Sequence, residues 1–245
     1  MKQTGPDFMP KNAMILAAGL GLRMRPLTDT RPKPLVAVAG QPLIEHILKP
    51  IEAVGVTEIV INVHYLADQI REHIAARHGS NVHISDETEK LLDSGGGIKK
   101  ALPYLGANPF FILNGDSFWI DGPRSNLLRL AEAWNPERMD ALLLVVASAL
   151  ATGYDGKGDF TMNPQGCLSR RMERYVAPFV YAGVGIIKPE LFDNTPDGPF
   201  SLNVLFDRSI EQGRLFGLRL DGEWLHVGTP DAIQAAEMRL LRSTL

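Results

Sequence analysis

Residues 15–34 combine glycine, arginine, lysine and proline in a spacing that suits a substrate with several phosphates. An apolar run gives way to Gly19 and Gly21, which let the backbone turn sharply and approach a ligand. Successive N–H groups in such a turn form a concavity that binds anions. Arg23 and Lys33 add two cations on a stretch stiffened by prolines. This segment predicts a polyphosphate site in which Arg23 and Lys33 are the catalytic cations.

Two familiar phosphate-binding motifs do not fit the segment. The dinucleotide fingerprint G-x-G-x-x-G has Met24 in place of its third glycine and Pro26 where a helix should run. The P-loop needs a lysine directly after a glycine at a fixed spacing, and no such lysine is present. An NAD-binding oxidoreductase therefore has little support. A glycine-rich surface loop with solvated cations is the plain alternative, and Arg23, Lys33 and the flanking prolines count against it.

Apolar runs alternate with longer segments of helical pattern along the chain. The expected strands are 13–17, 58–63, 82–85, 110–114 and 141–147, followed by shorter ones at 159–162, 179–187 and 215–219. The expected helices are 43–54, 67–77, 98–105, 127–134 and 232–241. This alternation predicts an α/β fold with an open, Rossmann-like, mostly parallel mixed sheet and helices on both faces.

Three motifs should meet at one edge of this sheet, because ligands bind beyond the carboxyl ends of parallel strands. The glycine segment follows the first strand, and Asn114-Gly115-Asp116 follows the strand at 110–114. Residues 94–97, which precede the expected helix at 98, can reach the same edge. Asp116 is a candidate ligand for Mg²⁺, which takes one or two carboxylates plus substrate phosphates. The alternative is an aspartate favoured only by turn chemistry.

Ser94 and the three glycines after it form the second unusual segment. They can act as a flexible loop or as an N-cap before a helix. Three consecutive glycines are costly in backbone entropy, so close approach of the backbone to something flat is the functional account. Glu87, in the preceding loop, can contribute to that contact, although a solvated charge is the favoured interpretation.

At these residues the chain resembles the nucleotidyltransferases that make sugar nucleotides, the NDP-sugar pyrophosphorylases. The segments that carry the resemblance are L-A-A-G-x-G-x-R-M-x-P-L-T, R-P-K-P-L, and residues 38–44, 94–98, 114–116, 181–186 and 227–230. The resemblance implies the nucleotidyltransferase (glycosyltransferase-A-like) fold. It also implies condensation of a nucleoside triphosphate with a sugar 1-phosphate, with Mg²⁺, to give an NDP-sugar and pyrophosphate. Among subfamilies the chain is most similar to the short enzymes that uridylylate N-acetylmuramate 1-phosphate in peptidoglycan recycling.

The resemblance also implies roles for individual residues. The residues implied to bind the nucleotide are Ala17, Ala18, Gly19, Gly21, Arg23, Ser94, Gly95, Gly96, Gly97 and Asn114. Those implied to bind the sugar phosphate are Lys33, Glu173, Gly183 and Asn203. As alternatives, Glu173 is a surface carboxylate and Asn203 is a polar residue in the first turn of a helix.

One position departs from the family pattern. Relatives commonly place a second magnesium-binding aspartate two residues before Gly-Thr-Pro, and this chain has His226 there. Imidazole is a poor ligand for Mg²⁺ and suits softer metals. His226 can therefore be read as a donor to phosphate or sugar, as a sign that Asp116 alone holds one magnesium, as a mark of weak activity, or as a buried packing residue.

Composition limits the partners and the compartment. A net charge of −3 with mixed signs argues against nucleic acid and against an anionic membrane. No apolar stretch reaches the length of a membrane span, the first residues do not resemble a signal peptide, and the single Cys167 suits a reducing compartment. We therefore expect a cytoplasmic protein. The expected organisation is an N-terminal extension, residues 1–12, and one nucleotidyltransferase domain, residues 13–245, with a nucleotide half (13–120) and a sugar-phosphate half (121–245).

The favoured reaction is uridylyl transfer from UTP to N-acetylmuramate 1-phosphate. A guanylyltransferase of the mannose 1-phosphate type and a catalytically weak regulatory protein that binds sugar nucleotides stay open as alternatives. His226 is the main support for the regulatory protein, and Arg23, Lys33 and Asp116 count against it. The sequence leaves the base, the sugar and the oligomeric state open.

Overall fold

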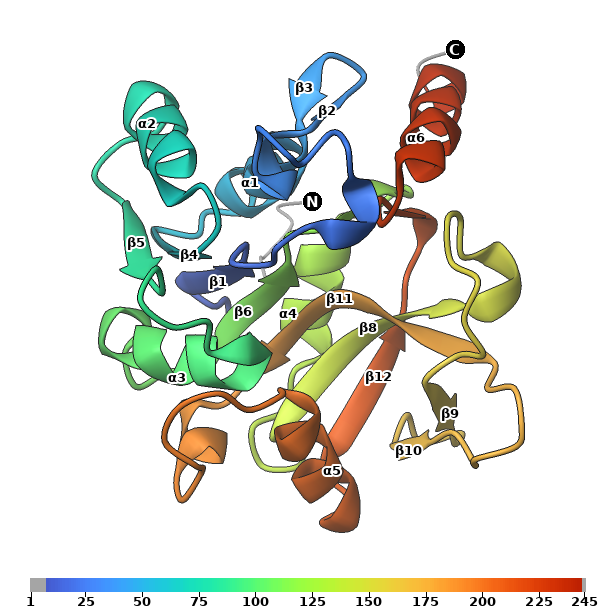
Figure 1. Cartoon of the computed structure of the whole chain (residues 1–245). Coiled ribbons are helices and arrows are strands. Elements are labelled where there is room, and N and C mark those ends of the chain that lie inside the picture. Colours follow the sequence, from blue (N-terminus) through green and yellow to red (C-terminus); the bar gives the residue numbers. More distant parts are fainter. Residues whose placement is uncertain (1–7, 244–245) are drawn as a thin grey trace, which may run out of the picture.

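A nine-stranded mixed sheet forms the centre of the computed structural model, which describes residues 8–243 (Figure 1). The strands of this sheet are β1 (Asn12–Leu16), β4 (Glu58–Val63), β5 (Val82–Asp86), β6 (Phe110–Asn114), β8 (Ala141–Ala147), β9 (Phe160–Met162), β10 (Leu168–Arg170), β11 (Phe179–Ile187) and β12 (Leu215–Arg219). Two small antiparallel pairs lie outside it, β2 (Ala37–Val38) with β3 (Gln41–Pro42) and β7 (Ser117–Asp121) with β13 (Gly222–His226).

The half of the sheet formed by β6, β1, β4 and β5 is parallel, and its register brings the strand ends level. Leu16 at the end of β1 pairs with Asn62 in β4 and with Asn114 in β6. The loops that follow these strands therefore begin side by side at one edge. Beyond β6 the sheet changes direction, because β11 runs antiparallel to both β6 and β8, while β12 is parallel to β8.

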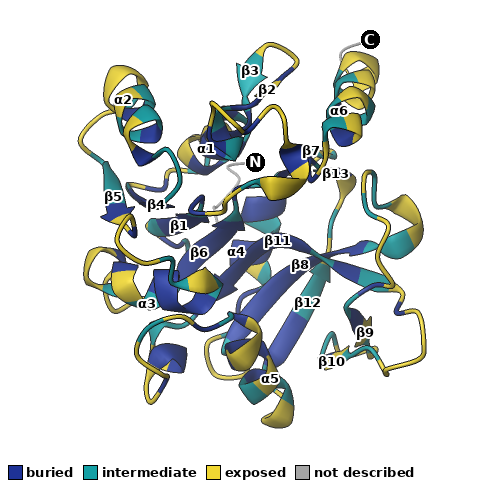
Figure 2. Ribbon diagram, viewed as in Figure 1, coloured by how far each residue is buried: buried dark blue, intermediate teal, exposed yellow. Residues whose placement is uncertain are grey.

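Helices cover both faces of the sheet, because alternate side chains of each strand point to opposite faces. The helices are α1 (Leu43–Ala53), α2 (Ala67–Arg77), α3 (Asp93–Leu105), α4 (Asn126–Ala133), α5 (Asn203–Glu211) and α6 (Pro230–Ser243). Ala13 and Ile15 belong to the core shared with α1, α2, α4 and α6, whereas Met14 belongs to the core shared with α3 and α5. Figure 2 shows the result, with buried strands between helices whose outer faces are exposed.

The expected α/β fold and its mostly parallel sheet are confirmed, and most elements lie within a residue or two of the expected bounds. The start expected for the third helix is wrong: α3 begins at Asp93 rather than at residue 98, so Ser94 and the three glycines lie inside its first turns. The strands β2, β3, β7, β10 and β13 were not expected, and α5 was implied only by the alternative reading of Asn203.

An aromatic contact joins the first described residue to the rest of the fold. Of the expected N-terminal extension, residues 1–7 lie outside the described residues, and Phe8 packs on Trp134 with ring centroids 6.2 Å apart. None of the helices in residues 8–243 has the length and apolar character needed to cross a membrane.

Candidate active site

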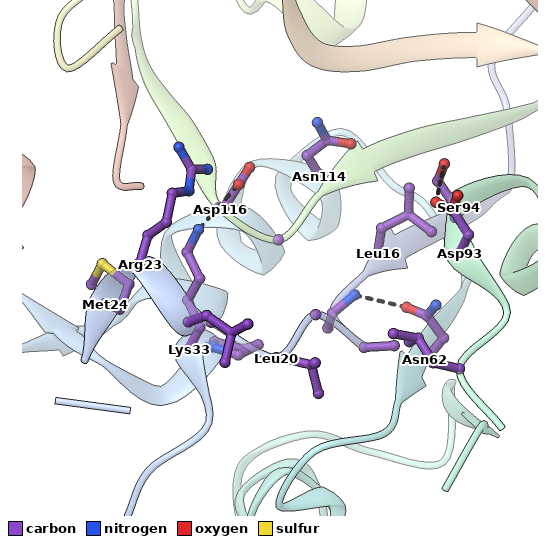
Figure 3. A pocket seen from close by; sticks show the side chains of 18 of the residues that line it. Leu16, Leu20, Arg23, Met24, Lys33, Asn62, Asp93, Ser94, Asn114 and Asp116 are labelled. Carbon is purple, nitrogen blue, oxygen red and sulfur yellow. Dashed lines mark hydrogen bonds and ion pairs between the residues drawn. The ribbon is translucent and has the colours of Figure 1, made fainter. Parts of the chain in front are cut away.

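A cavity of about 520 Å³ lies at the carboxyl edge of the parallel strands (Figure 3). Its lining comes from the loop after β1, the segment around Lys33, the loop after β6 and the start of α3. Three of the motifs expected to meet at this edge therefore surround one cavity. Arg23, Lys33 and Asp116 all belong to its lining.

The loop after β1 is shaped by a glycine in the left-handed region. Gly21 has φ +64 and precedes the 3₁₀ helix η1 (Leu22–Met24), which carries Arg23. A Cβ at this position would lie 3.1 Å from the Thr28 side chain and 3.2 Å from Lys33 Cβ. Only glycine suits both the backbone conformation and the space. The tight turn thus brings the segments that carry Arg23 and Lys33 together.

Lys33 opens a second 3₁₀ helix, η2 (Lys33–Leu35), between two buried prolines. Pro32 fixes the entry to this helix, and Pro34 lies inside it. The Lys33 side chain is only 12% exposed, and its Nζ donates to Asp116 Oδ2 at 3.0 Å. The two charges belong to distant parts of the chain and meet across the cavity, as Figure 3 shows.

Asp116 is held by its backbone as well as by its side chain. Its carbonyl oxygen accepts from the Val227 N–H at 2.9 Å, so the end of β13 is fixed beside it. Burial raises the pKa of the Asp116 carboxyl, but the charge of Lys33, the charge that His226 gains in acid, the hydrogen bond from Lys33 and the charge of Arg23 outweigh it and hold the pKa below its usual range. Asp116 is therefore a carboxylate at neutral pH.

His226 lies beside Asp116 because β13 pairs with β7, with Ser117 opposite His226. His226 Nδ1 is 4.0 Å from Asp116 Oδ1, and its ring stacks on Trp224 at a centroid separation of 5.6 Å. Burial and the charges of Lys33 and Arg23 lower the pKa of the imidazole, while Asp116 acts in the opposite direction. The net pKa is lowered, so His226 is neutral at pH 7.

Gly228 separates His226 from Arg23 at the rim of the cavity. A Cβ at Gly228 would lie 2.6 Å from His226 Nε2 and 3.4 Å from an Arg23 guanidinium nitrogen. The guanidinium, the imidazole and Asp116 are thus gathered around one short loop. Sequence reasoning singled out His226 by its position in the motif, and the pairing of β7 with β13 explains why it lies here.

The donor set around Asp116 fits a magnesium ion that takes most of its ligands from phosphates and water. Within residues 8–243, no group of three or more His, Cys, Asp or Glu is arranged to hold a metal by itself. Asp116 Oδ2 contacts Lys33, and its other oxygen faces the neutral His226 at 4.0 Å. One carboxylate oxygen without a cation on it suits Mg²⁺, which is usually bound by one or two carboxylates together with substrate phosphates.

The first turns of α3 lie differently from what the sequence suggested. Ser94 lines the cavity together with Asp93, but the three glycines after it are buried and do not line it. A Cβ at Gly95 would overlap the Phe200 ring, and one at Gly96 would overlap the Gly198 carbonyl oxygen. These glycines let the segment before α5 lie directly on α3.

The residues implied to bind the sugar phosphate do not all come together. Gly183 has φ +78, and a Cβ there would lie 2.7 Å from Ser117 Oγ and 2.9 Å from Asn114 Cβ, so it makes room for the loop after β6. Glu173 is exposed in the loop between β10 and β11, and Asn203 begins α5, where its Oδ1 accepts from Arg170 at 2.9 Å. Neither Glu173 nor Asn203 is among the residues that line the cavity.

Two polar residues of the lining were missed or misjudged. Glu87, expected to be a solvated charge, is 1% exposed, and Asn62 is 3% exposed. Asn62 Oδ1 accepts from the Ala17 N–H at 2.7 Å, a contact that Figure 3 shows. The position of Asn62 near the end of a buried strand, like that of Asn114, was the available signal.

Comparison with known proteins identifies the family. The model of the nucleotidyl transferase family matches residues 12–157. N-acetylmuramate alpha-1-phosphate uridylyltransferase of Caulobacter vibrioides is 46% identical, covering 94% of this chain and 97% of that protein. The protein with the same name in Neisseria meningitidis is 38% identical, covering 92% and 96%.

A solved structure of UDP-glucose pyrophosphorylase with UDP-glucose matches with a TM-score of 0.78 at 15% identity, covering 96% of this chain and all (100%) of that one, and this likeness concerns the fold alone. The resemblance drawn from the sequence motifs is confirmed by the family model and by the two relatives. The chain belongs to the nucleotidyl transferase family.

Proposed function

We propose that the protein transfers a uridylyl group from UTP to N-acetylmuramate 1-phosphate and releases pyrophosphate. The observation that carries the proposal is the meeting of Arg23, Lys33 and Asp116 around one cavity. The choice of substrates is supported by the names of two relatives that match this chain over almost its whole length. In this proposal residues 13–245 act as one domain in the cytoplasm, and the product belongs to peptidoglycan recycling.

The reaction needs little proton transfer. An oxygen of the sugar phosphate attacks the α-phosphorus of UTP, a new P–O bond forms, and the bond between the α-phosphorus and the bridging oxygen to the β-phosphate breaks. The attacking phosphate is already ionised near neutral pH, so no general base is required. The protein must instead bring two polyanions together in line and neutralise the charge that moves to the pyrophosphate.

The two cations divide this work by shape. Arg23 is exposed at the rim of the cavity, and its planar guanidinium can hold two oxygens of the triphosphate at once. Lys33 is a compact charge, held half-inside the cavity by its buried neighbouring prolines. In our proposal Lys33 lies between the sugar phosphate and the α-phosphate, and it exchanges its contact with Asp116 for contacts with phosphate oxygens.

Asp116 is the residue that would hold Mg²⁺, through the carboxylate oxygen that does not contact Lys33. When bound, the metal supplies Lewis-acid charge neutralisation of the phosphates. His226 is neutral beside this oxygen, so it adds no charge and can donate one hydrogen bond to a phosphate or sugar oxygen. The sugar is assigned to the half of the chain that follows residue 120.

The deciding experiment measures pyrophosphate release with Mg²⁺ for UTP, GTP, CTP and dTTP, each with N-acetylmuramate 1-phosphate and with mannose 1-phosphate. The expected result is release with UTP and N-acetylmuramate 1-phosphate at a rate far above the other pairs. Release with GTP and mannose 1-phosphate instead would favour the guanylyltransferase. Tight nucleotide binding without release under any pair would favour the regulatory protein.

A further inference from the structure

The lining of the cavity includes a buried carboxylate that no step of the proposed reaction uses. Glu87 follows β5 directly and is 1% exposed. Its Oε1 accepts from Asn62 Nδ2 at 2.7 Å, and its Oε2 accepts from the Leu92 N–H at 2.9 Å. Asn62 Oδ1 in turn accepts from the Ala17 N–H at 2.7 Å. A continuous chain of hydrogen bonds thus joins the loop after β1 to the residue before α3.

The polarity of this chain follows from its two ends. The N–H of Ala17 can only donate, so the oxygen of the Asn62 amide must face it and the NH₂ must face Glu87. The N–H of Leu92 also only donates. Both oxygens of Glu87 must therefore accept, which a carboxylate can do and an amide cannot. The residue type at position 87 is fixed by its two neighbours.

The position of Glu87 is fixed as tightly as its polarity. Its N–H donates to the Val63 carbonyl oxygen at 2.8 Å, and its own carbonyl oxygen accepts from His64 Nδ1 at 2.7 Å. A Cβ at Gly97 would lie 2.6 Å from Glu87 Oε1 and 2.7 Å from Asn62 Nδ2. The glycine lets α3 press directly on the Asn62–Glu87 contact. Both side chains are therefore confined on the side that faces α3.

The two ends of this chain of hydrogen bonds lie at two opposite walls of the cavity. Ala17 and the glycine loop line one side, and Asp93 and Ser94, next to Leu92, line the other. We infer that Glu87 is a positioning residue that sets the separation of these walls and so shapes the slot for the base and ribose of the nucleotide. This inference rests on the proposed function, because it takes the cavity to be the nucleotide site.

The test is a polarity exchange between positions 62 and 87. In Glu87→Gln the new NH₂ group meets a donor, either from Asn62 or from Leu92, and in Asn62→Asp two carboxylates face each other. In the double variant, the carboxylate introduced at position 62 accepts from the Ala17 N–H and from the amide NH₂ introduced at position 87. The oxygen of that introduced amide accepts from the Leu92 N–H. Every hydrogen bond of the chain is restored, with the charge moved to the neighbouring side chain.

We expect each single variant to weaken UTP binding roughly tenfold, as measured by calorimetry and as KM for UTP, since one buried group loses its partner. The KM for the sugar phosphate should stay within about twofold, because that substrate lies outside the slot in the proposed reaction. The double variant should bind UTP within about threefold of the wild type. The matched control is Glu58→Gln, at the other end of β4, where Glu58 accepts from His83 near the surface.

Unfolding temperatures of all variants separate positioning from simple stability. Lower unfolding temperatures with unchanged UTP affinity in both single variants would overturn the inference, as would a double variant no better than the worse single variant. If a single variant does not fold, the double variant decides: UTP affinity near wild type supports the inference, and tenfold weaker affinity overturns it.

The wild type separates failure of the inference from failure of the proposed function. A wild type that binds UTP but releases no pyrophosphate would contradict the proposed reaction alone, while the UTP affinities of the variants would still test Glu87. A wild type that binds no nucleoside triphosphate would sink both.

Discussion

Lys33 Nζ lies 3.0 Å from Asp116 Oδ2, although the two residues are 83 positions apart in the chain. The pair satisfies both charges before any substrate is bound. A lysine that is only 12% exposed would otherwise carry an uncompensated charge into a partly buried place. The same contact places the ammonium where phosphate oxygens must arrive if Asp116 is to share a metal with them. In the proposed reaction, the ion pair thus keeps both groups in position for the phosphates.

Arg23→Ala should lower turnover by roughly two to three orders of magnitude, the usual effect of losing one electrostatic donor to a transition state. The guanidinium lies at the cavity rim near Gly228, and its charge helps to lower the pKa of Asp116. The measurement is kcat for pyrophosphate release under saturating substrates. Arg25→Ala is the matched control, because Arg25 is exposed and pairs only with Asp29 at 3.2 Å among the contacts described for its side chain. Near-native turnover in Arg23→Ala would remove Arg23 from the proposed mechanism.

His226→Asp should make stability depend on magnesium. In the wild type, Asp116 lies 4.0 Å from the neutral imidazole of His226. The substitution replaces this imidazole with a second carboxylate, and two carboxylates repel each other when no cation lies between them. We expect Tm in EDTA to fall by roughly 2–4 °C, the shift produced by about 1 kcal/mol in a chain of this size. Magnesium chloride should recover this loss, and the recovery should exceed any gain of the wild type.

The control for that substitution is His226→Asn, which removes the imidazole without adding charge. Its Tm should respond to magnesium as the wild type does. An equal magnesium response in His226→Asp and His226→Asn would show that the second carboxylate does not help to hold a cation here.

Much of this site is local in sequence, and the rest depends on contacts between distant segments. The glycine turn, Arg23, Lys33 and Asp116 could be predicted because short motifs at strand ends carry them. The burial of Glu87 could not, because it depends on Asn62 and on a helix that packs over both. The strands β7 and β13 were missed because they pair with each other, about a hundred residues apart in the chain.

The stability of the protein should fall in mild acid, in part because Glu45 becomes protonated. Burial raises the pKa of this carboxyl, but hydrogen bonds and charges from His78 and His73 outweigh it and hold the pKa below its ordinary value of 4.5. A lowered carboxyl pKa contributes stability that is fully present above pH 4.5 and is lost as the pH falls through the folded-state value. The free energy of unfolding, measured with urea at a series of pH values, should therefore drop below about pH 4.5.

Glu45→Gln should flatten part of that acid dependence, because the amide cannot titrate. The control is Glu72→Gln, an exposed position on α2. A wild-type slope that persists unchanged in Glu45→Gln would mean that the histidine contacts of Glu45, at 2.6 Å and 3.1 Å, do not couple its ionisation to folding.

Gly95→Ala distinguishes the two accounts of the glycine run. If the glycines serve packing, the new methyl group meets the Phe200 ring and lies 2.9 Å from the Phe200 carbonyl oxygen, and overpacking should reduce the free energy of unfolding by about 1–3 kcal/mol. Gly79→Ala is the control, because a Cβ there finds its nearest neighbour, Asn81 Oδ1, at an ordinary 3.4 Å. Urea unfolding and UTP affinity should be measured on both variants. Loss of stability with little change in UTP affinity would support packing as the reason for glycine. Native stability with weakened UTP binding would instead support nucleotide binding by these residues, the role that the family resemblance implies.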